Sequence, residues 1–150
     1  MVALLAEAEF QFNREPRSIG PASDAITLHY SLISGLITGP RIHLTVIPEG
    51  AGEWCTIRGD GIVSVESKCM LFTPREDIVL VVVNGVYDAG DNGYVEALDG
   101  SLLVTATANL AVRFFTSALD YMWLNKTQYT AAGERDYSGG SLGFRLLELE

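Results

Sequence analysis

The sequence predicts an all-β protein, an antiparallel closed β-barrel of about eight strands with one short helix near the C-terminus. Two observations predict it. Runs rich in Val, Ile, Thr and aromatic residues recur along the chain, and these residues favour strands. Gly, Pro, Asp and Asn separate the runs at regular intervals, which is typical of antiparallel barrels and sandwiches. The 150 residues are long enough for one core and are predicted to form a single domain, 1–150.

Nine segments have this strand-forming composition. In order along the chain, strands are expected over residues 6–12, 25–33, 42–47, 53–58, 62–72, 78–87, 102–114, 126–131 and 142–149. Residues 117–124 are the exception, because Ser117 can cap a helix and Asp120 follows three residues later, at the start of a short amphipathic turn. We expect this helix to close one end of the barrel.

Two tight turns set the register of the three central strands. Gly59-Asp60-Gly61 centres one hairpin near residue 60, so Trp54 is expected opposite Glu66. The turn over residues 73–77 centres the next hairpin near residue 75 and sets Glu66 opposite Asn84. The sequence therefore predicts a row across the sheet made of an indole, a carboxylate and an amide.

Alternation along these strands defines two faces, and two interpretations of them remain open. The first face is apolar and contains Cys55, Ile57, Val63, Val65, Cys69, Leu71, Val79, Val81 and Val83. The second is mixed and contains Trp54, Thr56, Arg58, Ser64, Glu66, Lys68, Val82 and Asn84. Either the apolar face lines the interior and the mixed face is solvated, or the mixed face lines a cavity and the apolar face packs on the helix or on another subunit.

In the second interpretation Glu66 becomes the single acid of a small-molecule pocket walled by Trp54, Tyr30 and Trp123. Desolvation would disfavour the charged form of Glu66 and a nearby cation, Lys68 or Arg58, would favour it, which suits a general acid or base.

The composition argues against several partners. Ten basic and nineteen acidic residues give a net charge of -9, which repels phosphate backbones and anionic lipids, so neither nucleic acid nor a membrane is an expected partner. The first residues lack the basic region of a signal peptide, so a cytoplasmic location is expected. His29 and His43 lie in separate strands without ligand spacing, so no metal site is expected. Cys55 and Cys69 are expected as buried, unpaired thiols.

Four motifs carry a family resemblance. They are, in order, the run 33–40 ending in Gly39-Pro40, the run 46–54 ending in Glu53-Trp54, the turn Gly59-Asp60-Gly61, and Tyr121-Met122-Trp123-Leu124-Asn125. Together they resemble the signature of the domain of unknown function 3237 family. The resemblance implies a small closed barrel of the lipocalin-like or allene-oxide-cyclase-like kind, most of whose relatives have no assigned activity.

The chain also departs from the family pattern. Glu53 replaces an Asp, Ser34 replaces the first glycine of a pair, and Phe115 replaces an acid in a Phe-Glu-Thr motif. If Phe115 faced inward, its replacement of the acid would suit a pocket for an apolar ligand.

Two classes of function follow. In the first, the protein is a cofactor-free cyclase or isomerase that holds an apolar small molecule, such as a polyketide-type metabolite, in the barrel and acts by orientation; pericyclic and ring-forming reactions belong to this class. Its expected catalytic residues are Glu66, Asn84 and Tyr30, and its expected substrate-binding residues are Trp54, Thr56, Lys68, Phe114 and Trp123. In the second, it is a non-catalytic binding barrel or an oligomer-forming structural protein. A homo-oligomer, in the first instance a dimer, is expected in either class.

Overall fold

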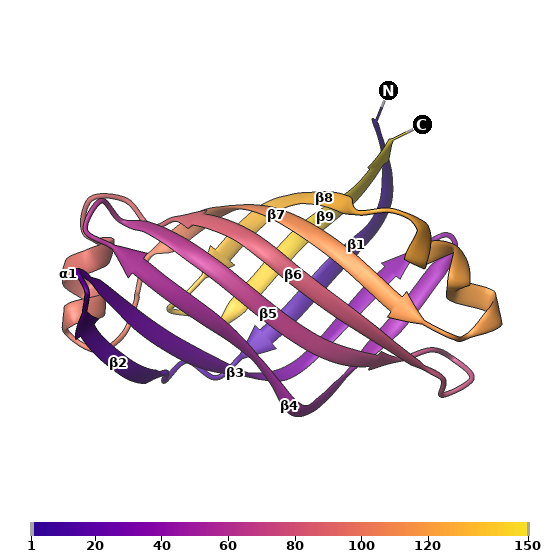
Figure 1. Cartoon of the computed structure of the whole chain (residues 1–150), viewed down its shortest axis with the longest axis horizontal. Helices are drawn as coiled ribbons and strands as arrows, with labels where there is room; N and C mark the ends of the chain where they lie inside the picture. The colour runs from indigo at the N-terminus through magenta and orange to yellow at the C-terminus, as the bar shows by residue number, and fades with distance from the viewer. Residues whose placement is uncertain (1, 150) are drawn as a thin grey trace.

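The computed structural model describes residues 2–149, which form an elongated antiparallel barrel (Figure 1). Its elements are β1 (Val2–Phe12), β2 (Arg17–Ala22), β3 (Ala25–Gly39), β4 (Ile42–Arg58), β5 (Ile62–Phe72), β6 (Ile78–Asp88), α1 (Gly93–Leu98), β7 (Thr105–Thr116), the 3-10 helix η1 (Leu119–Lys126), β8 (Tyr129–Asp136) and β9 (Ser141–Leu149). The strands run around the barrel in the order β1-β9-β8-β7-β6-β5-β4-β3, and pairing of β1 with β3 closes the ring. The predicted closed barrel of eight strands is therefore confirmed, and β2 pairs with β3 beside it.

Two predicted strands are halves of one. Residues 42–47 and 53–58 belong to the continuous β4, and the register with β5 shifts between Ile47 and Gly52. Gly50 lies in this interruption with a φ of 72°, a left-handed conformation that glycine adopts without strain. The Pro and Gly residues therefore mark a bulge that bends the strand, whereas the sequence suggested a turn.

The two helices lie at opposite ends of the barrel (Figure 1). The predicted helix over 117–124 is present as the 3-10 helix η1, and its N-cap is Ala118 with no capping side chain, so Ser117 does not cap it. The other helix, α1, was not predicted, because its six residues are too few for a visible periodicity. No helix in the described part of the chain has the length and apolarity needed to cross a membrane.

The apolar face of the central strands forms the barrel interior. Each of its predicted members is buried: Cys55, Ile57, Val63, Val65, Cys69, Leu71, Val79, Val81 and Val83. The first interpretation of the two faces is thus confirmed, and the expectation that the mixed face lines a cavity is wrong. Burying a continuous apolar surface outweighs enclosing a mixed one, and an eight-stranded barrel is just wide enough for inward side chains to fill. Cys55 and Cys69 are both buried and free, as predicted.

Candidate functional site

The predicted row of three side chains forms on the outer wall. Trp54 pairs with Glu66 on β4 and β5, and Glu66 pairs with Asn84 on β6, as the two turns predict. All three are exposed, and Trp54 keeps 49% of its surface accessible. With His29 and Lys68 they line a shallow groove of about 330 Å³. The placement of Glu66, Asn84, Trp54 and Lys68 in the barrel interior is therefore wrong, because the even-numbered residues of β5, of β6 and of β4 after residue 52 point outward.

The other expected site residues do not join this row. Thr56 is half-buried on the outer wall, with its Oγ1 3.5 Å from Oγ1 of Thr27. Trp123 is half-buried on η1, where its Nε1 donates to the carbonyl of Asp120. Phe114 is inside the barrel, packed edge-on against Tyr129 at a ring separation of 5.7 Å.

Phe115, whose replacement of an acid favoured an inward apolar pocket, points outward and is exposed. Tyr30 alone among the expected catalytic residues lies in the interior, and it is fully buried.

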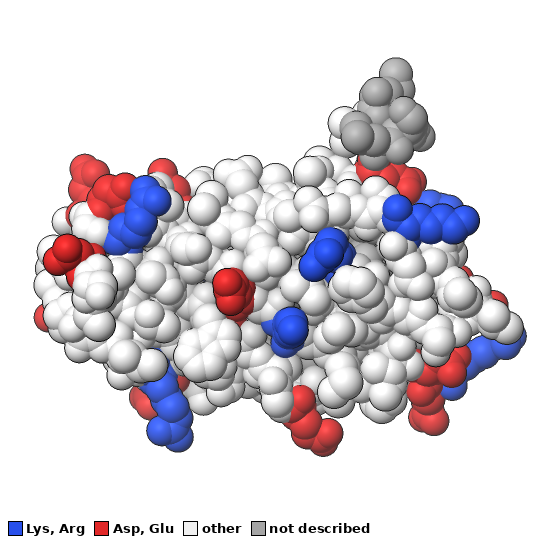
Figure 2. Space-filling model, in the orientation of Figure 1, with Lys and Arg blue, Asp and Glu red and all other residues white. Residues whose placement is uncertain are grey.

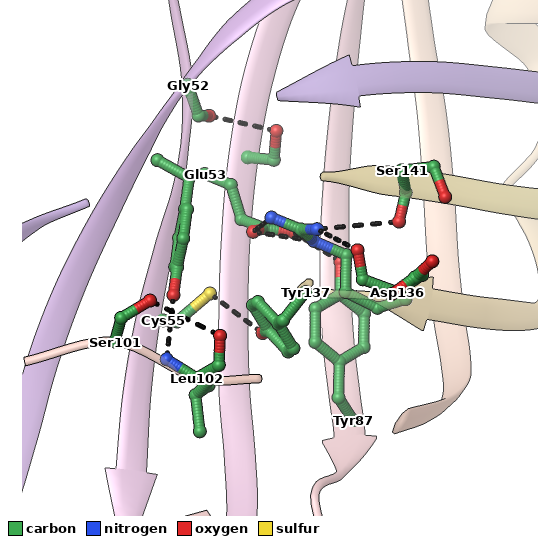
Figure 3. Close-up of polar contacts among 12 residues, drawn as sticks. Gly52, Glu53, Cys55, Tyr87, Ser101, Leu102, Asp136, Tyr137 and Ser141 are labelled. Atoms are coloured by element: carbon green, nitrogen blue, oxygen red, sulfur yellow. Dashed lines mark hydrogen bonds and ion pairs between the residues drawn. The ribbon is translucent and has the colours of Figure 1, made fainter. Parts of the chain in front are cut away.

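The acid inside the barrel is Glu53, the residue before Trp54. Its carboxylate forms an ion pair with Arg135 of β8, with Oε1 3.0 Å from Nη2 and 3.1 Å from Nε. Tyr87 of β6 donates its hydroxyl hydrogen to Oε2 at 2.5 Å. Glu53, Arg135 and Tyr87 have no accessible surface, so three strands bring a fully desolvated ion pair and a phenol into contact (Figure 3).

Aromatic rings and a thiol surround this ion pair. The Arg135 guanidinium lies 4.2 Å from the ring centroid of Tyr137 and 5.0 Å from that of Tyr30. The Tyr137 hydroxyl lies 3.3 Å from Sγ of Cys55, and Nη1 of Arg135 donates to the carbonyl of Asp136 at 3.2 Å. We call Glu53, Tyr87, Arg135, Tyr137, Cys55 and Tyr30 the inner cluster. Among the described residues, Glu53 and Arg135 are the only buried charged side chains.

Burial fixes the protonation of the inner cluster. Desolvation, reinforced by the negative charge of Glu53, raises the pKa of Tyr87 well above its usual value. Burial does the same to the pKa of the Tyr137 hydroxyl and of the Cys55 thiol. Desolvation opposes the charge on Arg135, but the charge and hydrogen bonds of Glu53 outweigh it and raise the pKa of Arg135. The cluster therefore combines a cation with hydroxyl groups that stay neutral at neutral pH, and the Glu53 carboxyl oxygens accept its hydrogen bonds.

Residues 89–104, which connect β6 to β7 and include α1, close the barrel next to the inner cluster. The backbone N–H of Leu102 donates to the Tyr30 hydroxyl at 3.2 Å, and Leu102 itself is fully buried (Figure 3). The N–H of Tyr137 donates to the carbonyl of Val104 at 3.2 Å. Helix α1 buries only Gly93 and Ala97. Two of the hydrogen bonds that hold this closing segment therefore join it to tyrosines of the inner cluster.

Sequence reasoning missed most of the inner cluster, although a signal for part of it was present. Alternate residues of a strand lie on the same face. Glu53 is therefore on the apolar face with Cys55 and Ile57, and Tyr87 is on it with Val83. An acid and a tyrosine on an otherwise apolar face indicate a buried polar contact. Arg135 gave no such signal, because the strand was expected to end at residue 131.

Comparisons with known proteins agree with the fold and with the family resemblance. Residues 2–148 match the family described as "Protein of unknown function (DUF3237)". No curated protein matches the chain. A protein with unknown function from Clostridium acetobutylicum ATCC 824 superposes with a TM-score of 0.82 at 16% identity, covering 100% of this chain and 99% of that one.

Two further solved structures share the fold. A beta-barrel like protein from Acinetobacter baumannii AYE has a TM-score of 0.76 at 17% identity, with 99% and 97% of the two chains covered. A protein from Penicillium herquei, described as an enzyme, has a TM-score of 0.68 at 21% identity, with 99% and 94% covered.

Proposed function

We propose that this protein, which belongs to the DUF3237 family, is a cyclase or isomerase that binds an apolar small molecule beside the inner cluster and rearranges it by proton transfer. One observation carries the proposal: an ionised pair, Glu53 and Arg135, is fully buried together with three tyrosines in an otherwise apolar barrel. Desolvating such a pair costs several kcal/mol per ion in typical proteins. The attraction between the two ions offsets roughly this cost, so the pair adds little net stability. Buried titratable groups with strongly perturbed pKa values, such as Tyr87 and Tyr137, are candidates for chemistry.

The groups present suit acid–base chemistry. The Glu53 carboxylate can accept a proton from an acidic O–H or C–H of the substrate, and Arg135 stabilises the negative charge that develops. Tyr137, whose raised pKa keeps its hydroxyl protonated, can deliver a proton to a carbonyl oxygen or alkene carbon of the same molecule. The proton on Glu53 then returns to Tyr137, so the substrate is rearranged without a change in mass. This reaction requires no cofactor.

Substrate access requires the closing segment, residues 89–104, to open. Leu102 is fully buried and its backbone N–H donates to the Tyr30 hydroxyl, so opening of this segment would give access to the inner cluster from this end of the barrel. Loops that cover active sites commonly open on the microsecond to millisecond timescale. The distant structural neighbour described as an enzyme supports a catalytic role for a barrel of this shape.

The test compares two glutamates of β4 and β5, one inside the barrel and one outside. Purified protein is incubated with a panel of phenolic and enolic polyketides, and products of unchanged mass but altered retention time are sought by liquid chromatography and mass spectrometry. We expect Glu53→Gln to lower turnover at least a hundredfold and Glu66→Gln to preserve it, because Glu66 is exposed on the outer wall. Equal turnover in wild type and Glu53→Gln would contradict the proposal.

A second variant covers the case in which Glu53→Gln fails to fold. Tyr137→Phe keeps the ion pair and removes the proposed proton donor, so its turnover should also fall while its circular dichroism spectrum stays native. Tyr121→Phe is the matched control, because Tyr121 lies at the η1 end of the barrel. A ligand that binds wild type tightly and leaves unchanged after long incubation would instead support the alternative function, a non-catalytic binding barrel.

A further inference from the structure

We propose that the outer face of β5, β6 and β7 binds a second copy of this chain. This surface, which we call the outer patch, consists of outward-pointing residues of the three strands. They are Glu66, Lys68, Met70, Phe72, Ile78, Leu80, Val82, Arg113 and Phe115. Figure 2 shows that the wall of the barrel is mostly uncharged here, while charged side chains gather towards its ends.

The register makes the apolar part of the outer patch continuous. Met70, Leu80 and Phe115 are directly paired across the three strands, and Phe72 pairs with Ile78 in the next row. Met70, Phe72, Ile78 and Phe115 keep 40%, 41%, 50% and 47% of their surfaces accessible. Neighbouring outward side chains on a sheet touch, so these residues form one surface. Aromatic residues, Met and Arg are the types enriched at protein interfaces, and Arg113 lies over the Phe115 ring at 5.4 Å.

Charge favours a second copy as the occupant. The chain carries -9 overall, yet the outer patch contains two basic residues and one acid. By contrast, the surface of β1, β9 and β8 exposes three acids, Glu7, Glu9 and Glu134, and one basic residue, Arg145. Two copies would repel through that acidic wall and can approach through the outer patch.

A two-fold contact also suits the charges within the patch. In such a contact each pair of residues occurs twice, so Glu66 of either copy can lie opposite Lys68 or Arg113 of the other. The patch is therefore complementary to itself in charge as well as in apolar character.

Strand geometry gives the projected area of the outer patch. With strands about 4.8 Å apart and a rise of about 3.4 Å per residue, four strands over the seven residues from Glu66 to Phe72 cover roughly 460 Å² in projection. The fourth strand here is β4, whose exposed Trp54 adjoins the patch through Glu66. A standard interface buries about 800 Å² per partner, and protruding side chains raise the accessible area above the projected one.

The experiment measures oligomeric state by sedimentation velocity between about 1 and 100 μM protein. We expect wild type to dimerise, and Phe115→Glu and Met70→Glu to weaken dimerisation at least tenfold while retaining native circular dichroism. Ile19→Glu is the matched control, because Ile19 is 61% exposed on β2 and lies off the patch. A wild-type monomer throughout this range would overturn the proposal, and so would a dimer that tolerates both patch substitutions.

A charge exchange tests the two-fold arrangement. Glu66→Lys alone and the double variant Lys68→Glu/Arg113→Glu should each dimerise at least tenfold more weakly than wild type, because like charges then face each other. An equimolar mixture of the two should regain association, since the altered charges are complementary between the two chains. A mixture no better associated than its components would overturn the two-fold contact.

Discussion

Glu53 and Trp54 are adjacent in the sequence, yet the Glu53 side chain is fully buried inside the barrel and the Trp54 side chain is half exposed on its outer wall. Strand alternation alone produces this difference. It separates the charged cluster inside the barrel from a groove on its surface lined by Trp54 and Glu66.

The first prediction concerns the stability that is lost when the buried ion pair of Glu53 and Arg135 is broken. Glu53→Ala leaves Arg135 as an uncompensated charge in the interior, so we expect the free energy of unfolding to fall by about 3–5 kcal/mol. Glu66→Ala, at an exposed position on the outer face of the adjacent strand β5, should change it by no more than about 0.5 kcal/mol. Urea unfolding at pH 7 measures both. Equal small effects would show that the ion pair is not buried as the structure places it.

The register of the central strands was predictable because it depends on local turns. A Gly-Asp-Gly turn and a Pro-containing turn fix the centres of two hairpins. Counting equal numbers of residues on either side of each centre then gives the pairs of Glu66 with Trp54 and with Asn84. It was harder to predict which face of the sheet points into the barrel, because alternation identifies two faces without showing which one lies inside. The apolar face is inside, as the burial of hydrophobic surface favours.

The inner cluster was less predictable because its members come from distant strands. Glu53 was expected to start a strand, and Arg135 lies in Gly133-Glu134-Arg135-Asp136, a polar run that reads as a turn. In the structure this run continues β8, and pairing with β7 and β9 supplies the hydrogen bonds that override its weak strand propensity. Only the closed topology brings Arg135 to Glu53.

The second prediction concerns the Tyr87 hydroxyl. Because it donates to a charged and fully buried carboxylate, Tyr87→Phe should lower the free energy of unfolding by about 1.5–3 kcal/mol. Tyr121→Phe removes a hydroxyl that accepts the neutral backbone N–H of His43 at 3.2 Å, and should cost about 1 kcal/mol. Urea unfolding of both variants gives the comparison. A larger loss in Tyr121→Phe would mean that the Tyr87 bond contributes little.

The third prediction concerns the closing segment, residues 89–104. Tyr30→Phe removes the hydroxyl that accepts the Leu102 N–H, so amide hydrogen exchange in this segment should accelerate at least tenfold. Tyr121→Phe again provides the control, because its hydroxyl accepts a backbone N–H at the same distance near the opposite end of the barrel. Its effect should be confined to residues around His43. Acceleration over the whole barrel in Tyr30→Phe would indicate global destabilisation and contradict a local closing role.

The fourth prediction concerns stability at alkaline pH. Burial raises the pKa of the Cys69 thiol from its usual 9.0 to about 12. Below pH 9 the thiol is protonated in both the folded and the unfolded chain, so its contribution is fully present there. Between pH 9 and 12 only the unfolded chain releases the proton, so unfolding becomes progressively more favourable as the pH rises.

Cys69→Ala isolates this contribution from that of the buried tyrosines, which ionise at higher pH. The packing lost with the thiol is the same at every pH, whereas the cost of keeping the thiol protonated exists only in wild type. The stability advantage of wild type over Cys69→Ala should therefore shrink by on the order of 2 kcal/mol between pH 7.5 and 10.5. Urea unfolding at the two pH values measures this change. An advantage that stays constant would show that the Cys69 thiol ionises equally in the folded and unfolded chains.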